Sequence, residues 1–312
     1  MDSTQHSLIY FSPDGGGTWT RQGEGADALK NMDLSDVWAV DENTVWAVGF
    51  PNTIIQTRDG GQSWSRVSGP TQKTDIELFS VSMIGSDDIW ISGSHGTIYH
   101  SANGGTSWKS IQSDVLTNRY LQGIHAINKN VVYAVGGFES NSRGFIARTM
   151  DGGQTWDSIQ LENNYNRHRW IGVSASDADH ILVYGGQSHF ALSTNGGINW
   201  TNDSIQGTGG TGGADINCLK MVDSQTYWGA FDYDGIYITN DGGSNWTSQG
   251  PAPGPEGMWL YGIDYYDKNL AVIVAESSMS NRGKIIQTNN GGQLWELRLE
   301  TPVHMKKVSF IK

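Results

Sequence analysis

The sequence has few of the residues that mark disulfide-rich or membrane-spanning proteins. Among its 312 residues there is one cysteine, Cys218, so no internal disulfide can form. Prolines number only 7, and no apolar run approaches the roughly 18 residues that span a bilayer, so we expect no membrane insertion. Cys218 lies in an alternating apolar run without a nearby histidine, and we expect a buried core thiol there rather than a nucleophile.

Positive charge is also scarce. The chain carries 20 Lys and Arg against 32 Asp and Glu, a formal net charge of −12. Nucleic-acid binding needs clustered basic residues on the phosphates, so we expect no nucleic-acid partner. The polar start, residues 1–6, does not read as a signal peptide. We expect an extracytoplasmic or secreted protein, and a cytoplasmic location stays open.

One motif dominates what is present. A Ser or Thr, any residue, Asp or Asn, two glycines, two further residues and a Trp recur seven times, and successive motif tryptophans are 44 to 49 residues apart. Asp-Gly or Asn-Gly between apolar runs predicts a hairpin turn whose central residues tolerate positive φ. We expect the Asp or Asn side chain to accept hydrogen bonds from turn amides and the Trp to pack between sheets. The motif residues are therefore structural: Trp19, Trp64, Trp108, Trp156, Trp200, Trp246 and Trp295 with their turns.

Each repeat also carries four strand-like runs. In one repeat they are 37–40, 45–48, 54–57 and 63–67, here named A to D from the inside outwards. Four strands in roughly 45 residues are typical of a propeller blade. The sequence therefore predicts an all-β, seven-bladed β-propeller of four-stranded antiparallel blades, forming a single domain over residues 1–312, and we expect a monomer.

The ends of the chain predict how the ring closes. Residues 8–12 and 18–21 look like C and D strands, and residues 305–311 look like an A strand. We expect these segments to share one composite blade, which removes sheet edges. Its B strand has no evident source, because only the polar residues 1–6 remain. Either this blade has three strands, or the chain was cut from a longer one.

The repeated motif resembles that of the Asp-box, or bacterial neuraminidase repeat, proteins. The run from Val45 to Gly49 followed by Thr53 to Gly61 is most similar to the photosystem II stability/assembly factor-like family. This resemblance covers nearly the whole chain and implies a binding or assembly role. Sialidases of the wider group carry an Arg-Ile-Pro segment that is absent here, and xyloglucan-cleaving relatives use two propeller domains. The basic arginine patch of the photosystem factors is not evident in this acidic chain.

We expect a functional site on the face opposite the motif turns, where the B–C and D–A loops surround the channel mouth. Two B–C loops, 136–144 and 275–283, are longer than the others and carry Glu139 and Glu276. These could face each other as acid and base, with Asp232 as an extra carboxylate. The favoured alternative is that each Glu pairs with the arginine of its own loop, Arg143 or Arg282, and orders that loop.

Aromatic and histidine residues outside the motif are the other candidates. Tyr120, Trp170 and Tyr261 lie at the equivalent start of strand A in three repeats, and Trp259 is near. They could stack on sugars or clamp a peptide, or instead pack the blades together. His95, His168 and His189 could share the channel mouth, but scattered surface histidines are the favoured reading. We predict no metal and no cofactor, and we retain His95, His189, Arg143 and Arg282 as ligand-binding candidates.

The leading functional prediction is a non-enzymatic binding or assembly propeller that holds a protein segment or a glycan on this face. No complete catalytic set is present, which favours this reading. The alternative is a carbohydrate-active enzyme, a glycoside hydrolase or polysaccharide lyase, favoured by the two long loops that carry a Glu.

Overall fold

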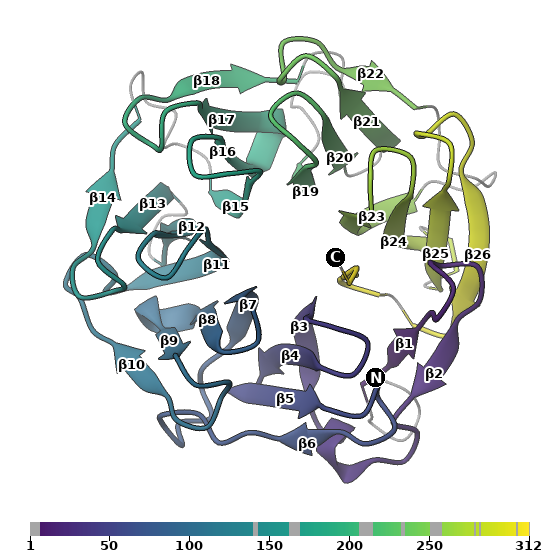
Figure 1. Ribbon diagram of the computed structural model, residues 1–312, viewed down its shortest axis with the longest axis horizontal. Helices are drawn as coiled ribbons and strands as arrows, with labels where there is room; N and C mark the ends of the chain where they lie inside the picture. Colours follow the sequence, from purple (N-terminus) through teal and green to yellow (C-terminus); the bar gives the residue numbers. More distant parts are fainter. Residues whose placement is uncertain are drawn as a thin grey trace.

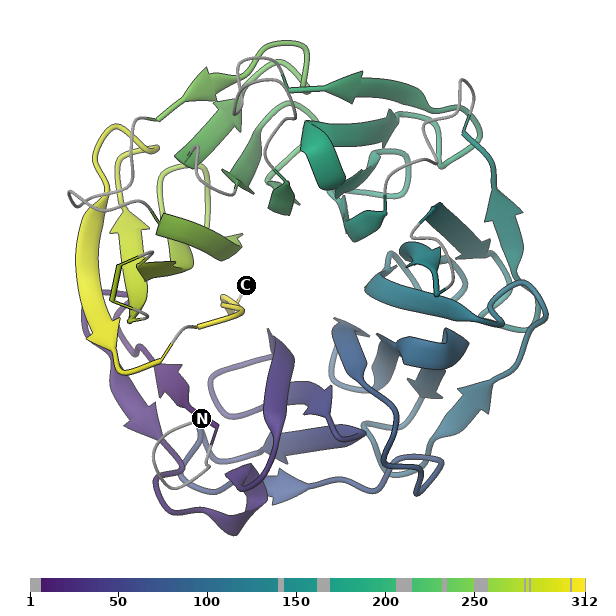
Figure 2. The ribbon, with the colours of Figure 1, turned by 180° about the vertical axis from the view of Figure 1, so that it is seen from behind.

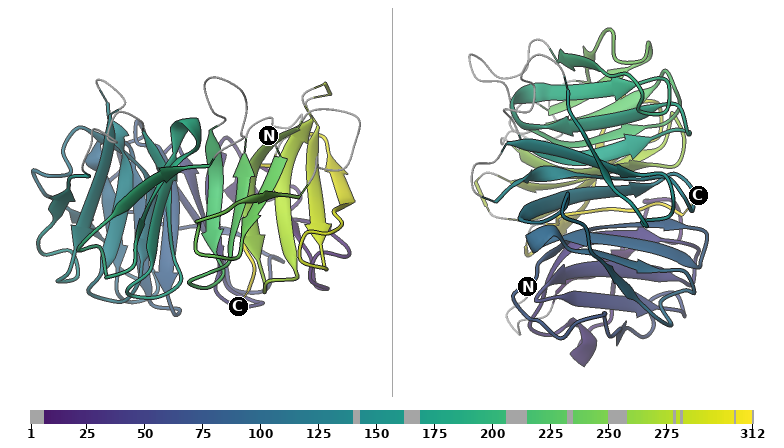
Figure 3. Two further views of the ribbon diagram at one scale, coloured as in Figure 1. Left: turned by 90° about the horizontal axis from the view of Figure 1, so that it is seen from above. Right: turned by 90° about the vertical axis from the view of Figure 1, so that its left-hand side faces the viewer.

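The computed structural model describes residues 7–139, 143–161, 169–205, 215–231, 235–249, 258–277, 279–280, 282–303 and 305–311. The blades are arranged around a central channel, as Figure 1 shows from one side and Figure 2 from the other. Seen edge-on in Figure 3, the molecule is a disc whose thickness is about the length of a strand. Within the described residues there are six four-stranded antiparallel sheets and one two-stranded sheet. The all-β propeller with four-stranded blades is therefore confirmed.

The six four-stranded sheets are numbered here as blades 1 to 6, each with strands A to D from the channel outwards. Blade 1 is β3 (Asp33–Ala39), β4 (Val45–Phe50), β5 (Thr53–Thr57) and β6 (Ser65–Arg66); blade 2 is β7 (Leu78–Ile84), β8 (Asp88–Gly93), β9 (Ile98–Ser101) and β10 (Lys109–Ile111). Blade 3 is β11 (Arg119–Ala126), β12 (Val132–Phe138), β13 (Gly144–Thr149) and β14 (Asp157–Ile159); blade 4 is β15 (Trp170–Ala175), β16 (Ile181–Gly185), β17 (His189–Ser193) and β18 (Thr201–Ser204). Blade 5 is β19 (Ile216–Met221), β20 (Tyr227–Phe231), β21 (Gly235–Thr239) and β22 (Thr247–Ser248); blade 6 is β23 (Met258–Tyr265), β24 (Ala271–Ser277), β25 (Gly283–Thr288) and β26 (Glu296–Thr301). The two-stranded sheet is β1 (Ile9–Phe11) with β2 (Thr20–Gln22), and short 3₁₀ turns lie at η1 (Asp27–Leu29), η2 (Ser94–Gly96) and η4 (Gly186–Ser188).

The B strands form the centre of each blade. Every residue of β8, β20 and β24 is buried, since neighbouring blades cover both faces of these strands. Cys218 is 2% exposed, which confirms the predicted core thiol. No helix in the described ranges is long and apolar enough to cross a bilayer.

The motif turns follow one pattern of hydrogen bonds. In the turn that starts at Thr57, the Thr57 hydroxyl accepts from Gly61 N at 2.9 Å, and Asp59 Oδ1 accepts from Ser63 N at 2.9 Å. The predicted capping by the Asp side chain is thereby confirmed. Positive φ falls on the two glycines, Gly60 (68°) and Gly61 (83°), and not on the Asp, so the turn is longer than the two-residue hairpin expected.

The motif tryptophans pack between blades, as predicted. Trp108 of blade 2 meets the ring of Trp46 in blade 1 edge-to-face, with centroids 6.1 Å apart. The pair Trp156 and Trp90 repeats this contact between blades 3 and 2 at 6.4 Å. Each motif Trp in these pairs thus anchors its D strand on a B strand of the preceding blade.

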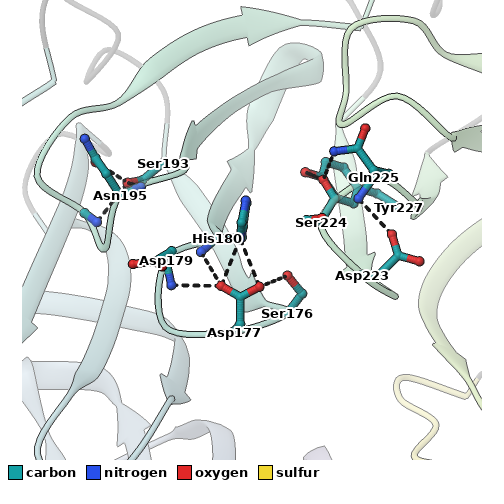
Figure 4. Close-up of polar contacts among 11 residues, drawn as sticks. Ser176, Asp177, Asp179, His180, Ser193, Asn195, Asp223, Ser224, Gln225 and Tyr227 are labelled. Carbon is teal, nitrogen blue, oxygen red and sulfur yellow. Dashed lines mark hydrogen bonds and ion pairs between the residues drawn. The ribbon is translucent and has the colours of Figure 1, made fainter.

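The A–B turns share a face with the motif turns, and Figure 4 shows both in blade 4. Asp177 Oδ1 accepts from Asp179 N at 2.8 Å and from His180 N at 2.9 Å, which closes the A–B turn (Figure 4). Gly196 N of the motif turn donates to Asp179 O at 3.0 Å. In blade 4 these polar groups of the face therefore hold the A–B turn and the motif turn together.

The composite blade differs from the prediction. Strands β1 and β2 pair as expected, but residues 305–311 are extended without forming a strand. No described segment provides a B strand between them, so the ladder that would make 305–311 a strand cannot form. The structure thus has six complete blades, and the count of seven is not confirmed.

Candidate functional site

The predicted site residues divide among four blades on the face opposite the motif turns. His95, Tyr120, Glu139 and Arg143 gather at blades 2 and 3, and Trp259, Tyr261, Glu276 and Arg282 belong to blade 6. Trp170 and His189 belong to blade 4, while Asp232 and His168 lie outside the described residues. Blades 3 and 6 face each other across the central channel (Figure 1).

At blades 2 and 3 the carboxylate of Glu139 joins two loops. Glu139 follows β12 directly, and its Oε1 accepts from His95 N at 3.0 Å and lies 2.9 Å from His95 Nδ1. Glu139 thus contacts His95 of the neighbouring blade, whereas the sequence suggested that it pairs with Arg143 of its own loop. His95 holds a left-handed backbone, φ 57°, at the tip of η2, and its side chain is 51% exposed.

An aromatic and cationic surface adjoins this ion pair. Tyr120 is 36% exposed and packs edge-to-face on Phe79 of blade 2, with centroids 6.1 Å apart. The guanidinium of Arg119 stands 3.5 Å over the ring of Phe138, and burial lowers its pKa. We call this set the blade 2–3 cluster: Phe79, His95, Arg119, Tyr120, Phe138 and Glu139.

Sequence reasoning missed three members of this cluster: Phe79, Arg119 and Phe138. Arg119 is the direct register partner of Phe138 across β11 and β12, so its contact follows once the strand register is known. Phe79 occupies a β-bulge between Leu78 and Ser80. The signal for Arg119 was its place beside Tyr120 at the start of an A strand.

In blade 6 the predicted carboxylate is part of a strand. Glu276 lies on β24, is 7% exposed, and its Oε2 accepts from Tyr261 Oη at 2.8 Å. Arg282 Nη1 lies 3.1 Å from Glu300 Oε2, so it pairs with the D strand of its blade. Trp259 is half-buried as the register partner of Glu276. Glu139 and Glu276 thus belong to blades on opposite sides of the channel, where Glu139 accepts from His95 of blade 2 and Glu276 from Tyr261 of its own blade.

The predicted equivalence of Tyr120, Trp170 and Tyr261 is wrong. Each A strand has a one-residue β-bulge near its start, and Tyr261 occupies the bulge between Leu260 and Gly262. Trp170 instead precedes the bulge, at the position that Leu78 takes in blade 2, and is fully buried. Packing between blades therefore accounts for Trp170. His189 begins β17 and is half-buried there.

The central channel contains a second set of titratable groups. A cavity of about 360 Å³ is lined by the A strands and includes Lys220, Asp264 and Asp36. Burial opposes the charge of Lys220, but Asp264, Cys218, Asp36 and Tyr265 together outweigh it and raise the pKa of Lys220. Asp36 Oδ2 accepts from Val81 N at 3.0 Å, so this carboxylate joins two blades. No cluster of three or more metal-ligating side chains occurs in the described part of the chain.

A family model described as photosynthesis system II assembly factor YCF48 matches residues 28–136, about a third of the chain. These residues span blade 1, blade 2 and most of the two inner strands of blade 3. They include Phe79, His95, Arg119 and Tyr120 of the blade 2–3 cluster, but not Phe138 and Glu139. A comparison with curated protein sequences gives no significant match.

Solved structures share the fold at low sequence identity. YCF48 bound to D1 peptide has a TM-score of 0.66 and 19% identity, covering 96% of this chain and 85% of that one. YCF48 from Cyanidioschyzon merolae has a TM-score of 0.51 and 18% identity, covering 91% and 99%. An ancestral GH74 enzyme has a TM-score of 0.60 and 17% identity, covering 95% of this chain but 40% of that one. The family match and the two YCF48 structures confirm the resemblance that the repeats predict: this chain is a β-propeller similar to the photosystem II assembly factors of the YCF48 type.

Proposed function

We propose that this chain is a non-enzymatic binding propeller that recognises a segment of another protein on the face opposite the motif turns. The observation that carries the proposal is the blade 2–3 cluster. It combines an exposed aromatic ring, a guanidinium and a carboxylate that the blade template does not require. The similarity to YCF48, one structure of which holds a D1 peptide, supports the same reading.

The chemistry of the cluster suits an extended peptide. Tyr120 offers an apolar ring with a polar hydroxyl, a side chain that gives large contact area at low entropic cost. Glu139 Oε1 accepts from His95 N at 3.0 Å and lies 2.9 Å from His95 Nδ1, so it joins the two loops beside it. A preorganised surface loses less entropy on binding than one that must first become ordered. Recognition of a protein segment follows from these features, and catalysis does not.

The carbohydrate-active alternative has less support. Paired carboxylates of glycosidases must lie within roughly 5–10 Å of each other across the substrate. Glu139 and Glu276 belong to blades on opposite sides of the channel, and Glu276 is buried and bonded to Tyr261. The GH74 relative is matched over only 40% of its own length. We therefore do not propose glycan cleavage.

A peptide selection tests the proposal. Peptides selected on the chain from a random library should bind the parent, and Tyr120→Ala should weaken binding at least about tenfold, as loss of a central aromatic contact does. The matched control is Tyr266→Ala, because Tyr266 is also exposed (58%) but lies in the A–B turn of blade 6, on the other face. Equal affinity for both variants would place the binding surface elsewhere. Binding to glycans on an array, with no peptide selected from the library, would instead favour a carbohydrate-binding function.

We further propose that the whole chain, residues 1–312, is one closed ring in which β1, β2 and residues 305–311 belong to an incomplete seventh blade. The inner segment makes the contacts of an A strand: Phe310 N donates to Asp264 at 2.7 Å, and Ala39 N donates to Ser309 Oγ at 3.1 Å. Gly262 of blade 6 approaches the backbone of Lys306, just as Gly123 of blade 3 approaches that of Gly172. The expected extracytoplasmic location stays a prediction.

A further inference from the structure

One position of the A strands has the same task in several blades. It lies three residues after the β-bulge of the strand. At Ser82, Ser174 and Asp264 the side chain in this position accepts a hydrogen bond from a backbone amide of the next inner segment, at 2.7 to 3.1 Å. A hydroxyl or carboxylate here therefore joins neighbouring inner strands. We call this place in each A strand the linking position.

Lys220 occupies the linking position of blade 5 and cannot perform this task. An ammonium has three donors and no acceptor, so it cannot bond an amide of the next strand. Lys220 is half-buried and lines the central cavity of about 360 Å³. Among the described residues, no acceptor lies within hydrogen-bond or ion-pair distance of its Nζ. Its raised pKa keeps the ammonium charged at neutral pH. The packing of the inner strands therefore does not account for this lysine.

Asp264, at the linking position of blade 6, has an oxygen to spare. Asp264 is 6% exposed and lines the same cavity. Its Oδ2 accepts from Phe310 N at 2.7 Å, whereas no donor from the described residues contacts Oδ1. A carboxylate can accept about four hydrogen bonds in all. Adjacent blades thus present an open carboxylate oxygen and an ammonium at the same level of the channel, and the two groups do not pair with each other.

The charges around the cavity favour an occupant with no net charge. Two aspartates and two lysines line it: Asp36, Asp264, Lys220 and Lys307. Asp36 is already engaged, because its Oδ2 accepts from Val81 N at 3.0 Å. A buried charge without a partner is costly, so an ion of one sign would leave an imbalance here. A molecule with one charge of each sign can instead satisfy Lys220 and Asp264 together.

The wall across the channel from Lys220 is aromatic. Trp38 takes the linking position of blade 1 and lines the same cavity. Figure 1 shows β3, the strand of Trp38, on the opposite side of the channel from β19, the strand of Lys220. An occupant held by Lys220 and Asp264 therefore faces Trp38 across the channel. The volume of the cavity is in the range that holds small organic ligands, and an aromatic wall favours an apolar body.

We propose that the central cavity binds a free α-amino acid with an aromatic or other apolar side chain. The carboxylate of the ligand accepts from the Lys220 ammonium, and its own ammonium donates to Asp264 Oδ1. Both charged groups of an α-amino acid are attached to one carbon, so a single head group spans the two blades. The side chain of the ligand packs on Trp38. This site is separate from the blade 2–3 cluster and needs no peptide bound there.

Phenylalanine is the probe, titrated into the full chain by isothermal calorimetry, with saturation-transfer NMR as a second readout. Three analogues each lack one part of the ligand. 3-Phenylpropionate lacks the ammonium, phenethylamine lacks the carboxylate, and glycine lacks the side chain. Each analogue should bind at least about tenfold more weakly than phenylalanine, because it loses a charge-assisted hydrogen bond or the apolar contact.

Two variants test the protein side of the site. Lys220→Met removes the ammonium but keeps an unbranched side chain, and it should lose at least about tenfold in phenylalanine affinity. Asp264→Asn keeps an acceptor for Phe310 N but removes the negative charge, and we expect a loss of the same size. The matched control is Lys129→Met, because Lys129 is exposed in the A–B turn of blade 3. This control should bind phenylalanine as the parent does.

Several outcomes would overturn the proposal. The cavity is not an amino-acid site if phenylalanine shows no saturable binding, or if Lys220→Met binds it as tightly as the parent. Equal binding of 3-phenylpropionate or phenethylamine would reject a ligand with both charges, and equal binding of glycine would reject the contact with Trp38. If Asp264→Asn does not fold, Lys220→Met and the analogues decide. A negative result here leaves the peptide surface at Tyr120 standing, since that surface is tested by a different ligand.

Discussion

Replacing Trp156 by alanine tests the packing that joins the blades. Trp156 is 5% exposed and lies with Trp90, Leu121 and Ile124 in one core cluster. A side chain of this size buries about 200 Å², which at about 25 cal/mol per Å² is about 5 kcal/mol. Buried Trp to Ala changes cost about 3–5 kcal/mol in measured series, so we expect a loss in that range.

Thermal and urea denaturation measure the loss. For a chain of this length the melting temperature should fall by about 2 °C per kcal/mol, and therefore by about 6–10 °C. The matched control is Leu294→Ala, because Leu294 is also an apolar residue of a motif turn but is 57% exposed. The control should stay within about 0.5 kcal/mol of the parent. A Trp156→Ala variant as stable as Leu294→Ala would refute the reasoning that motif tryptophans hold neighbouring blades together.

Three further changes test closure, the motif turns and the blade 6 carboxylate. Deleting residues 303–312 should cause aggregation or non-cooperative unfolding in size-exclusion chromatography and calorimetry, since the inner contacts of the last blade are removed. Hydrogen bonds from Ser63 lower the pKa of Asp59 to about 2, so the stability that Asp59 contributes is present above about pH 4 and is lost as the pH falls towards 2. Asp59→Asn should flatten this part of the profile of melting temperature against pH, and an unchanged profile would contradict the assignment. Glu276→Gln should leave peptide binding unchanged while it lowers the melting temperature, because a buried acceptor for Tyr261 is weakened.

The repeated features of the fold could be predicted from the sequence because they are local. The Gly-Gly pair, the Asp side chain and the Trp all act within one turn of about eight residues, so their roles follow from turn chemistry and spacing. The turn of Asp59 and Ser63 shows the expected bond at 2.9 Å. The burial of Cys218 likewise followed from apolar alternation alone.

Features that depend on register could not be predicted in this way. A bulge adds one residue and moves every following side chain to the other face of the strand. Tyr120 lies two residues before the bulge of its strand, Trp170 one residue before it, and Tyr261 at it. Residues that looked equivalent in sequence therefore differ in register, and Trp170 is in the core. Sequence spacing alone does not report where such a bulge lies.

Contacts between blades also could not be predicted from the sequence. Glu139 and His95 are 44 residues apart and meet only because two neighbouring B–C loops converge. The sequence offered Arg143 as a nearer partner for Glu139, on the same loop. Proximity in a propeller is set by the ring, so the nearest opposite charge along the chain is a poor guide to the actual ion pair.

The contacts that join the inner strands follow one pattern, which extends to residues 305–311. A polar side chain on one inner strand accepts a hydrogen bond from a backbone amide of the next, at 2.7 to 3.1 Å. The acceptor and donor pairs are Asp36 with Val81, Ser82 with Ala126, Ser174 with Met221, Asp264 with Phe310 and Ser309 with Ala39. The last two pairs carry the series through residues 305–311 and so link blade 6 to blade 1 without a four-stranded sheet between them. We therefore expect removal of that segment to open the ring.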